Sequence, residues 1–252
     1  MPKVSLVMPV HNALPYVGEA IASVLAQRFT DWELVVWDDG STDGSLDAAR
    51  LAAGGDPRVR FFAEGENRGT THAVNQAVAQ TSGEYIGVVD ADDRLLPAAI
   101  RETVALLDRR PRVGLAYTRY RIINERGEPG PVGRRCQIPY APNRLLIDFM
   151  VYHQRLFRRR WFDHLGGLDE SYRYAQDYEF CLRMSEVAPI QQVPQVLHEY
   201  RVHDRSVSQV KRAEQRACAA RAVRAAISRR GMADHFALDV GDDGSFRLRK
   251  LG

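Results

Sequence analysis

The stretch Tyr85-Ile-Gly-Val-Val-Asp-Ala-Asp-Asp93 decides the fold expected for this chain. Its apolar first half has the composition of a buried strand, and three carboxylates follow at once: Asp90, Asp92 and Asp93. In an open α/β sheet, ligands bind beyond the carboxyl ends of the strands. Clustered carboxylates repel one another unless a cation lies between them, and a divalent metal that carries phosphates is the usual one. A solvated turn that caps a helix is the alternative, and this stretch alone leaves both interpretations open.

Three earlier segments repeat the arrangement of an apolar strand followed by polar residues: 4–12, 32–43 and 59–69. Apolar residues recur at helical spacing in residues 16–27 and 70–80, which predicts helices between the strands. Strand–helix alternation of this kind is typical of a parallel, doubly wound sheet. All four predicted strands therefore deliver polar side chains at one edge of the sheet.

The second half of the chain is less regular. Residues 114–118 and 121–124 are predicted strands, whereas residues 129–142 hold four of the chain's prolines and resist assignment. A helix is predicted from Asp177, and an aspartate at that place is ordinarily a helix N-cap.

Residues 211–252 differ in composition from the rest. Residues 211–230 carry seven basic side chains against one acidic side chain and are rich in alanine, which predicts a helix. One interpretation is peripheral contact with the inner face of a membrane, although an alanine-rich face would bury little area there. The favoured interpretation is a helix packed on the main domain or used in a homodimer. Residues 236–240 and 246–249 flank a glycine-rich turn and predict a small hairpin with no assigned function.

Composition is that of a soluble enzyme with one sizeable core. The chain has 252 residues, 45% of them hydrophobic, and a formal net charge of +3, which is too small to indicate a nucleic-acid partner. Cys136, Cys181 and Cys218 have neither paired spacing nor a metal motif, and no stretch is apolar enough to span a bilayer. A reducing, cytoplasmic location is therefore expected.

The ordered set of motifs resembles glycosyltransferase family 2, whose members have the GT-A fold and invert the configuration of the sugar they transfer. The matching motifs are Val4-Ser-Leu-Val-Met-Pro-Val-His-Asn12, Asp38-Asp-Gly-Ser-Thr-Asp43, Glu66-Asn-Arg-Gly69, Ala73-Val-Asn75, Gly83-Glu-Tyr85, Asp90-Ala-Asp-Asp93, Gly167-Leu-Asp-Glu170, Ala175-Gln-Asp-Tyr-Glu179 and Tyr200-Arg-Val-His203. They run in family order and cover the chain to about Ser208.

The resemblance implies an α/β protein with a Rossmann-like, mostly parallel central sheet flanked by helices. Residues 1–210 would form the GT-A domain, with nucleotide-sugar binding in 1–110 and acceptor binding in 111–210. Residues 211–252 would add the basic helix and the hairpin. The implied reaction moves a sugar from a UDP-sugar to a hydroxyl or another nucleophile of a glycan, lipid-linked, peptide or small-molecule acceptor.

The resemblance also assigns contacts to the nucleotide. Pro9, Val10, His11 and Asn12 would line the base pocket, with the His11 ring stacked on the base. Asp39 would accept the imide proton of uracil, which favours UDP over purine nucleotides. Arg68 would support the base or the phosphates.

By the same resemblance, Asp90 would hold the ribose hydroxyls, with Ala91 beside it. Asp92 would bind Mn²⁺ or Mg²⁺ that bridges the two phosphates, and His203 would be a ligand of the metal or of a phosphate. The cation would stabilise charge on the departing UDP.

Residues 200–208 resemble a mobile segment that closes over the diphosphate. Arg201 and Arg205 could neutralise phosphate charge there. The alternative is a solvated basic loop. His153 and His198 receive no predicted function.

Matched to the family, Asp177 is the catalytic base that takes the acceptor's proton, a role that contributes roughly 10²–10⁴-fold in rate. The family commonly has Glu-Asp at this point, and this chain has Gln176-Asp177. The base is retained, but the acceptor contacts of the preceding residue are in doubt.

Two other functions stay open: a sugar nucleotidyltransferase, and a catalytically idle module that binds nucleotide sugars or glycans. A nucleotidyltransferase would need a glycine-rich, basic loop near the N-terminus, which Val10-His-Asn-Ala13 does not supply. An idle module is disfavoured because Asp92 and Asp177 are both present.

Overall fold

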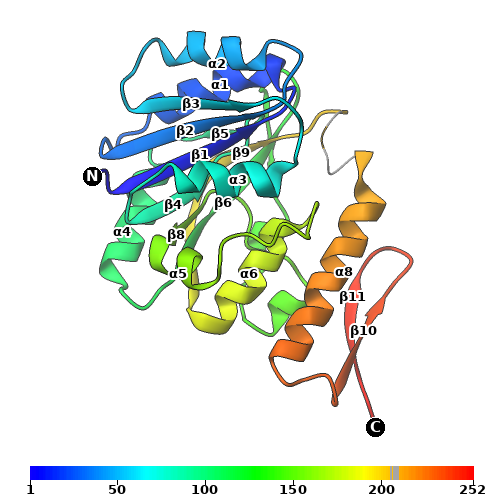
Figure 1. The fold of residues 1–252 in the computed structure, drawn as a ribbon. Coiled ribbons are helices and arrows are strands. Elements are labelled where there is room, and N and C mark those ends of the chain that lie inside the picture. The colour runs from blue at the N-terminus through cyan, green and yellow to red at the C-terminus, as the bar shows by residue number, and fades with distance from the viewer. Residues whose placement is uncertain (205, 207–209) are drawn as a thin grey trace.

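The computed structural model describes residues 1–204, 206 and 210–252. Its centre is a nine-stranded sheet in the order β3-β2-β1-β4-β8-β6-β9-β5, with β7 paired to β6 (Figure 1). The strands are β1 (Val4–Val10), β2 (Trp32–Asp39), β3 (Val59–Glu64), β4 (Tyr85–Val88), β5 (Arg94–Leu95), β6 (Leu115–Ile123), β7 (Pro129–Val132), β8 (Arg155–Arg158) and β9 (Ile190–Arg201). The helices are α1 (Leu14–Leu25), α2 (Ser45–Ala53), α3 (Thr70–Ala79), α4 (Ala99–Arg109), α5 (Arg159–His164), α6 (Gln176–Val187) and α8 (Arg212–Arg229).

The first half confirms the predicted strand–helix alternation. β1 pairs in parallel with both β2 and β4, and β2 pairs in parallel with β3. Parallel neighbours need a crossover connection, and α1, α2 and α3 supply the three crossovers.

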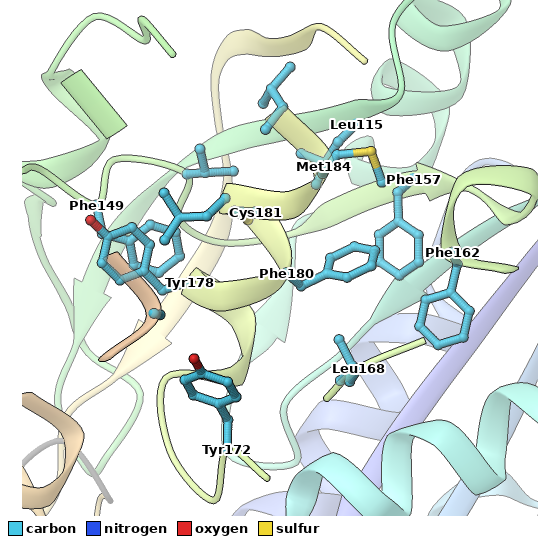
Figure 2. Packing of buried hydrophobic residues seen from close by; sticks show 14 of the residues in the cluster. Leu115, Phe149, Phe157, Phe162, Leu168, Tyr172, Tyr178, Phe180, Cys181 and Met184 are labelled. Carbon is cyan, nitrogen blue, oxygen red and sulfur yellow. The ribbon is translucent and has the colours of Figure 1, made fainter. Parts of the chain in front are cut away.

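Helices cover both faces of the sheet because successive side chains of a strand point to opposite faces. Leu6 and Met8 of β1 pack in a cluster with residues of α1, α2 and α4, whereas Val7 packs in a second cluster with residues of α3, α5 and α6. Figure 2 shows the second cluster, in which the rings of Phe157 and Phe180 have centroids 5.0 Å apart. The protein is therefore a three-layer α/β/α structure.

The second half departs from the prediction in several elements. β6 is one continuous strand rather than the two predicted, because no glycine or proline interrupts it and Arg119 and Tyr120 pair with β9 across a register shift. α4, β5, β8 and β9 have no counterpart in the sequence-based assignment. β8 pairs antiparallel with both β4 and β6, and β5 and β7 pair antiparallel with β9 and β6, so the sheet is mostly parallel with three reversed strands.

The predicted C-terminal helix and hairpin are both confirmed. α8 packs beside α6, and β10 (Phe236–Val240) pairs antiparallel with β11 (Phe246–Lys250) against α8 (Figure 1). The apolar side of α8 faces the core through Ala222, Val223 and Ala226, which are fully buried. This packing supports the favoured interpretation of the helix. None of the described helices is long and apolar enough to cross a membrane.

Gly83 gives a test of this packing, since it lies in the turn between α3 and β4 and close against β1. A β-carbon there would lie 2.7 Å from both the backbone nitrogen and the Oγ atom of Ser5. β1 is paired on both sides and cannot give way. We therefore expect Gly83→Ala to lower the free energy of unfolding by about 1–3 kcal/mol, as overpacking does, in a chemical denaturation experiment.

Gly65→Ala is the matched control, because no atom lies within 4 Å of a β-carbon built at Gly65. That variant should unfold at the parent midpoint. Equal stability of the two variants would contradict the close approach of Gly83 to β1.

Candidate active site

Polar residues that end the parallel strands meet at one edge of the sheet. The register places Val10 at the end of β1 opposite Asp38 of β2, and Val88 at the end of β4 leads directly to Asp90. β8 runs in the opposite direction, so its first residue, Arg155, lies at this same edge.

The residues predicted to line the base pocket turn from β1 toward the end of β2. Nδ1 of His11 donates a hydrogen bond to the carbonyl oxygen of Asp39 at 2.9 Å, and the Asn12 amide donates to Nε2 of His11 at 3.1 Å. Asn12 has a φ of 50°, and its backbone N–H donates to Oγ of Ser41 at 3.0 Å. The His11 ring is thus fixed in orientation while it stays exposed to solvent.

Asp39 ties β2 to the loop that follows β3. Its side chain is buried, and its two oxygens accept the backbone N–H groups of Arg68 and Gly69, each at 2.8 Å. Gly40 tightens the same contact, since a β-carbon there would lie 2.7 Å from the carbonyl carbon of Glu66. Each carboxylate oxygen has two lone pairs, so Asp39 can still accept further hydrogen bonds. Recognition of uracil by Asp39 stays a prediction. The Arg68 side chain is exposed on this loop.

The acidic residues after β4 form a cluster whose negative charges repel one another. Burial and the charges of Asp93 and Asp92 raise the pKa of Asp90 to about 7. Burial and the charge of Asp92 also raise the pKa of Asp93. The repulsion therefore favours the protonated forms of Asp90 and Asp93, and a divalent ion would relieve it.

The strand pairing brings His203 to Asp92. β5 pairs antiparallel with β9, with Arg94 opposite Glu199, so the chain beyond β9 returns to the acidic cluster. Nε2 of His203 lies 3.1 Å from Oδ2 of Asp92. Two adjacent ligands of an octahedral ion with bonds of about 2.1 Å would be about 3.0 Å apart. The pair therefore has the chemistry and the spacing to hold Mn²⁺ or Mg²⁺.

A second group of metal-type donors lies behind this pair. Asp93, His153 and His198 are buried, and one donor atom from each lies within 4.8 Å of the others. Nε2 of His198 is 2.7 Å from Oδ2 of Asp93, and burial lowers the pKa of His198 to about 4, so the pair shares one proton. The two imidazole rings are stacked with an interplanar angle of 9°. Stacked rings direct their lone pairs side by side rather than at one point, so this group suits packing better than cation binding.

Arg201 is not placed as predicted. Its side chain is fully buried, and the guanidinium donates to the carbonyl oxygens of Asp92, Asn124 and Glu125 and to the carboxylate of Glu19. A group whose N–H donors already bind protein atoms, away from solvent, is not available to phosphate. The predicted phosphate contact is therefore wrong for Arg201, which instead fixes the backbone of Asp92.

The other phosphate-neutralising candidate lies outside the described residues. That candidate is Arg205, and residues 207–209 lie outside the described part as well. Closure of residues 200–208 over a diphosphate therefore stays a prediction.

Asp177 lies in the first turn of α6 with its carboxylate partly exposed. The N-cap of this helix is Ala175, with a φ of 57°, so the simple N-cap interpretation of Asp177 is wrong. Oδ1 of Asp177 accepts the N–H of Tyr178 at 2.8 Å, and Oδ2 accepts Nη1 of Arg155 at 3.0 Å. The side chain is 31% exposed, which an acceptor would need in order to reach it.

Arg155, His153 and His198 complete this edge, although the sequence alone assigned no function to any of them. They lie beside the predicted residues only because β8 and β9 enter the sheet there. A local motif carries no signal for such an arrangement, since each partner is distant in the chain.

The model of glycosyltransferase family 2 matches residues 5–166. The chondroitin synthase of Escherichia coli is 32% identical over 208 residues, which are 82% of this chain and 30% of that protein. The hyaluronan synthase of Pasteurella multocida is 29% identical over 208 residues, 82% of this chain and 21% of that protein. The chain belongs to glycosyltransferase family 2 and spans less than a third of the length of these two relatives.

Solved structures show the same fold. A mannosyltransferase of Pyrobaculum calidifontis, in complex with GDP-Man and Mn²⁺, superposes with a TM-score of 0.71 at 22% identity, over 90% of this chain and 64% of that one. TarS of S. aureus (residues 1–349, with UDP-GlcNAc) gives 0.73 at 19% identity, over 89% and 66%. Together with the mostly parallel sheet, these matches identify the GT-A glycosyltransferase fold.

The placement of Arg201 predicts the effect of its loss. Arg201→Met would remove one hydrogen-bond donor from each of three carbonyl oxygens and from Glu19, so we expect the free energy of unfolding to fall by about 2–3 kcal/mol. Thermal or chemical unfolding without nucleotide measures it. Arg126→Met, on an exposed residue of the same turn, is the control and should be neutral. Parent stability of Arg201→Met together with weakened UDP binding would restore the phosphate role.

Proposed function

We propose that the protein transfers a sugar from a UDP-sugar to an acceptor nucleophile, with inversion at the anomeric carbon and with the help of a divalent cation. The observation that carries the proposal is the meeting of Asp92 and His203 at the carboxyl edge of the sheet, 3.1 Å apart. Asp177 faces this edge from α6 through its ion pair with Arg155, which supplies a base on the acceptor side.

Asp92 and His203 would hold the cation, which supplies electrostatic stabilisation of the charge that develops on the departing diphosphate. The repulsion within the acidic cluster, which raises the pKa values of Asp90 and Asp93, supports this assignment because such a site favours any ion that relieves it. The mannosyltransferase of the same fold was solved with Mn²⁺.

For the nucleotide we assign uridine, with Asp39 as the acceptor of the imide proton and the exposed His11 ring stacked on the base. Asp39 is rigidly held by Arg68 and Gly69, so its remaining lone pairs have fixed directions. Asp90 would accept the ribose hydroxyls. The fold does not choose the base, since its solved examples include a GDP-sugar complex and a UDP-sugar complex.

The transfer step follows from the position of Asp177. The acceptor hydroxyl donates a hydrogen bond to this carboxylate, and its oxygen attacks the anomeric carbon on the face opposite the diphosphate. The bond from that carbon to the phosphate oxygen breaks, UDP keeps the electron pair, and the hydroxyl proton passes to Asp177. Attack and departure on opposite faces invert the configuration.

The acceptor that we propose is a glycan. Two relatives that match 82% of this chain are named as synthases of chondroitin and of hyaluronan, which supports a saccharide acceptor. Because the chain spans less than a third of their length, their whole activity does not transfer to it. Lipid-linked, peptide and small-molecule acceptors would be recognised by mass spectrometry of the products.

A donor screen tests the reaction class and the cation together. With Mn²⁺ we expect UDP release from a UDP-sugar, no comparable GDP release from GDP-mannose, and loss of turnover in EDTA. Asp92→Ala and His203→Ala should both abolish turnover and weaken UDP binding in Mn²⁺, because each removes a ligand of the cation. Asp47→Ala, an exposed carboxylate of α2, is the control.

Three results would overturn parts of this assignment. Full activity in excess EDTA would exclude the cation, and GDP competing as well as UDP would exclude base selection by Asp39. Release of pyrophosphate from UTP and a sugar 1-phosphate, without UDP release from a UDP-sugar, would identify a nucleotidyltransferase.

The variant Asp177→Asn tests the proposed role of Asp177 as the general base. The amide keeps the size of the side chain and an oxygen for the N–H of Tyr178, so stability and UDP affinity should change little. Sugar transfer should fall by about 10²-fold or more, since a general base acts only as the proton leaves. Asp163→Asn, on an exposed residue of α5, is the control. Parent-like transfer by Asp177→Asn would move the base elsewhere, first to Asp169 or Glu179.

A further inference from the structure

We propose that Arg155 is a positioning residue for the transfer step: it holds the carboxylate of Asp177 in the orientation from which that group takes the acceptor's proton. The inference rests on the proposed role of Asp177 as the base. No motif of the chain points to Arg155, and the donor-binding residues do not include it.

The place of Arg155 in the fold makes this contact specific. Arg155 begins β8, the reversed strand between β4 and β6, and it lies opposite Tyr117 of β6. β6 therefore holds the strand at the point where the side chain departs, and β4 pairs with it from the next residue, Leu156. Nη1 also donates to the carbonyl oxygen of Val151 at 3.1 Å, which fixes the guanidinium from its own segment.

The charges around Arg155 explain why its guanidinium stays paired with the carboxylate of Asp177. The arginine side chain is only 15% exposed, and Asp177 is its single ion-pair partner among the described residues. Burial alone would lower the pKa of Arg155, but the negative charge of Asp177, followed by contributions from Cys181 and Asp90, raises it. A buried cation with one counter-ion keeps that counter-ion close, because separation would leave the charge uncompensated.

The geometry of Asp177 shows what Arg155 adds. The N–H of Tyr178 binds Oδ1 at 2.8 Å, and this single bond would leave the carboxylate free to rotate about its last torsion. Arg155 binds Oδ2 at 3.0 Å and stops that rotation. The lone pairs that remain then have fixed directions on a side chain that is partly open to solvent. Misplacement of a reacting group by about 1 Å can cost about 10²-fold in rate.

The experiment combines Arg155→Met, Arg155→Lys, Asp177→Asn and the double variant Arg155→Met/Asp177→Asn in the full chain. Single-turnover transfer from a radiolabelled UDP-sugar to a verified acceptor gives the rate, and calorimetry with UDP and Mn²⁺ gives the affinity. Arg160→Met is the control, because Arg160 is exposed on α5, donates to the carbonyl oxygen of Pro111 and lies over the ring of its neighbour Trp161.

We expect Arg155→Met to slow transfer by about 10-fold to 10²-fold while UDP affinity stays within a few-fold of the parent. The transfer rate of Arg155→Lys should lie between those of Arg155→Met and the parent, since lysine keeps the charge but not the planar guanidinium. In the double variant, loss of Arg155 should add almost nothing to the loss of Asp177, because the arginine acts through that carboxylate. If Arg155 had only a structural role, Arg155→Met would slow transfer by the same factor in the parent and in Asp177→Asn.

Each contrary result has a definite meaning. If Asp177→Asn is silent, the proposed base fails and this inference falls with it. If Asp177→Asn is slow but Arg155→Met transfers like the parent, only the role of Arg155 is refuted. Weaker UDP binding that matches the loss of transfer would make Arg155 a donor ligand. Should Arg155→Met fail to fold, parent-like transfer by a stable Arg155→Lys would overturn the proposal, and slower transfer with parent UDP affinity would support it.

Discussion

The concentration of negative charge after β4 is the constraint on which the rest of the structure depends. Asp90, Asp92 and Asp93 lie within four residues of one another, and burial makes their mutual repulsion costly. The groups that offset it come from the far half of the chain: Arg201 holds the backbone of Asp92, and His198 shares a proton with Asp93. The geometry of the acidic cluster is therefore fixed by contacts within the protein itself.

A chain of alternating charges connects this cluster to the surrounding elements. Glu19 of α1 accepts hydrogen bonds from both Arg94 and Arg201, at 3.1 Å and 2.7 Å. Glu199 of β9 likewise lies between Arg94, at 2.7 Å, and Arg121 of β6, at 3.0 Å. Because each partner is held by two others, the strands that carry the site cannot shift independently. This rigidity suits a reaction in which the fixed positions of a few oxygen atoms determine the rate.

The parallel half of the fold and most of its polar edge could be predicted, because apolar periodicity and the residues that end a strand are local properties. β8 could not, since Arg155–Arg158 is four residues long with a charge at each end, and neither could the two-residue β5. Arg201 misled the prediction because a basic residue in a motif does not reveal whether it is buried. The pairing of Asp93 with His198, 105 positions away, depends on a strand order that sequence does not display.

The return of β9 to β5 has a consequence for biosynthesis. Asp92 and His203 are 111 positions apart, and β9 also forms the neighbour of β6. While a ribosome is still making the chain, β1 to β4 can pair as soon as they emerge, whereas the acidic cluster must wait for almost all of the remaining sheet. During that interval the nascent chain exposes an unpaired edge of β6 beside clustered carboxylates, and late, long-range closure of this type is slow. The same connection that brings His203 to Asp92 thus makes the unfinished chain dependent on protection from aggregation.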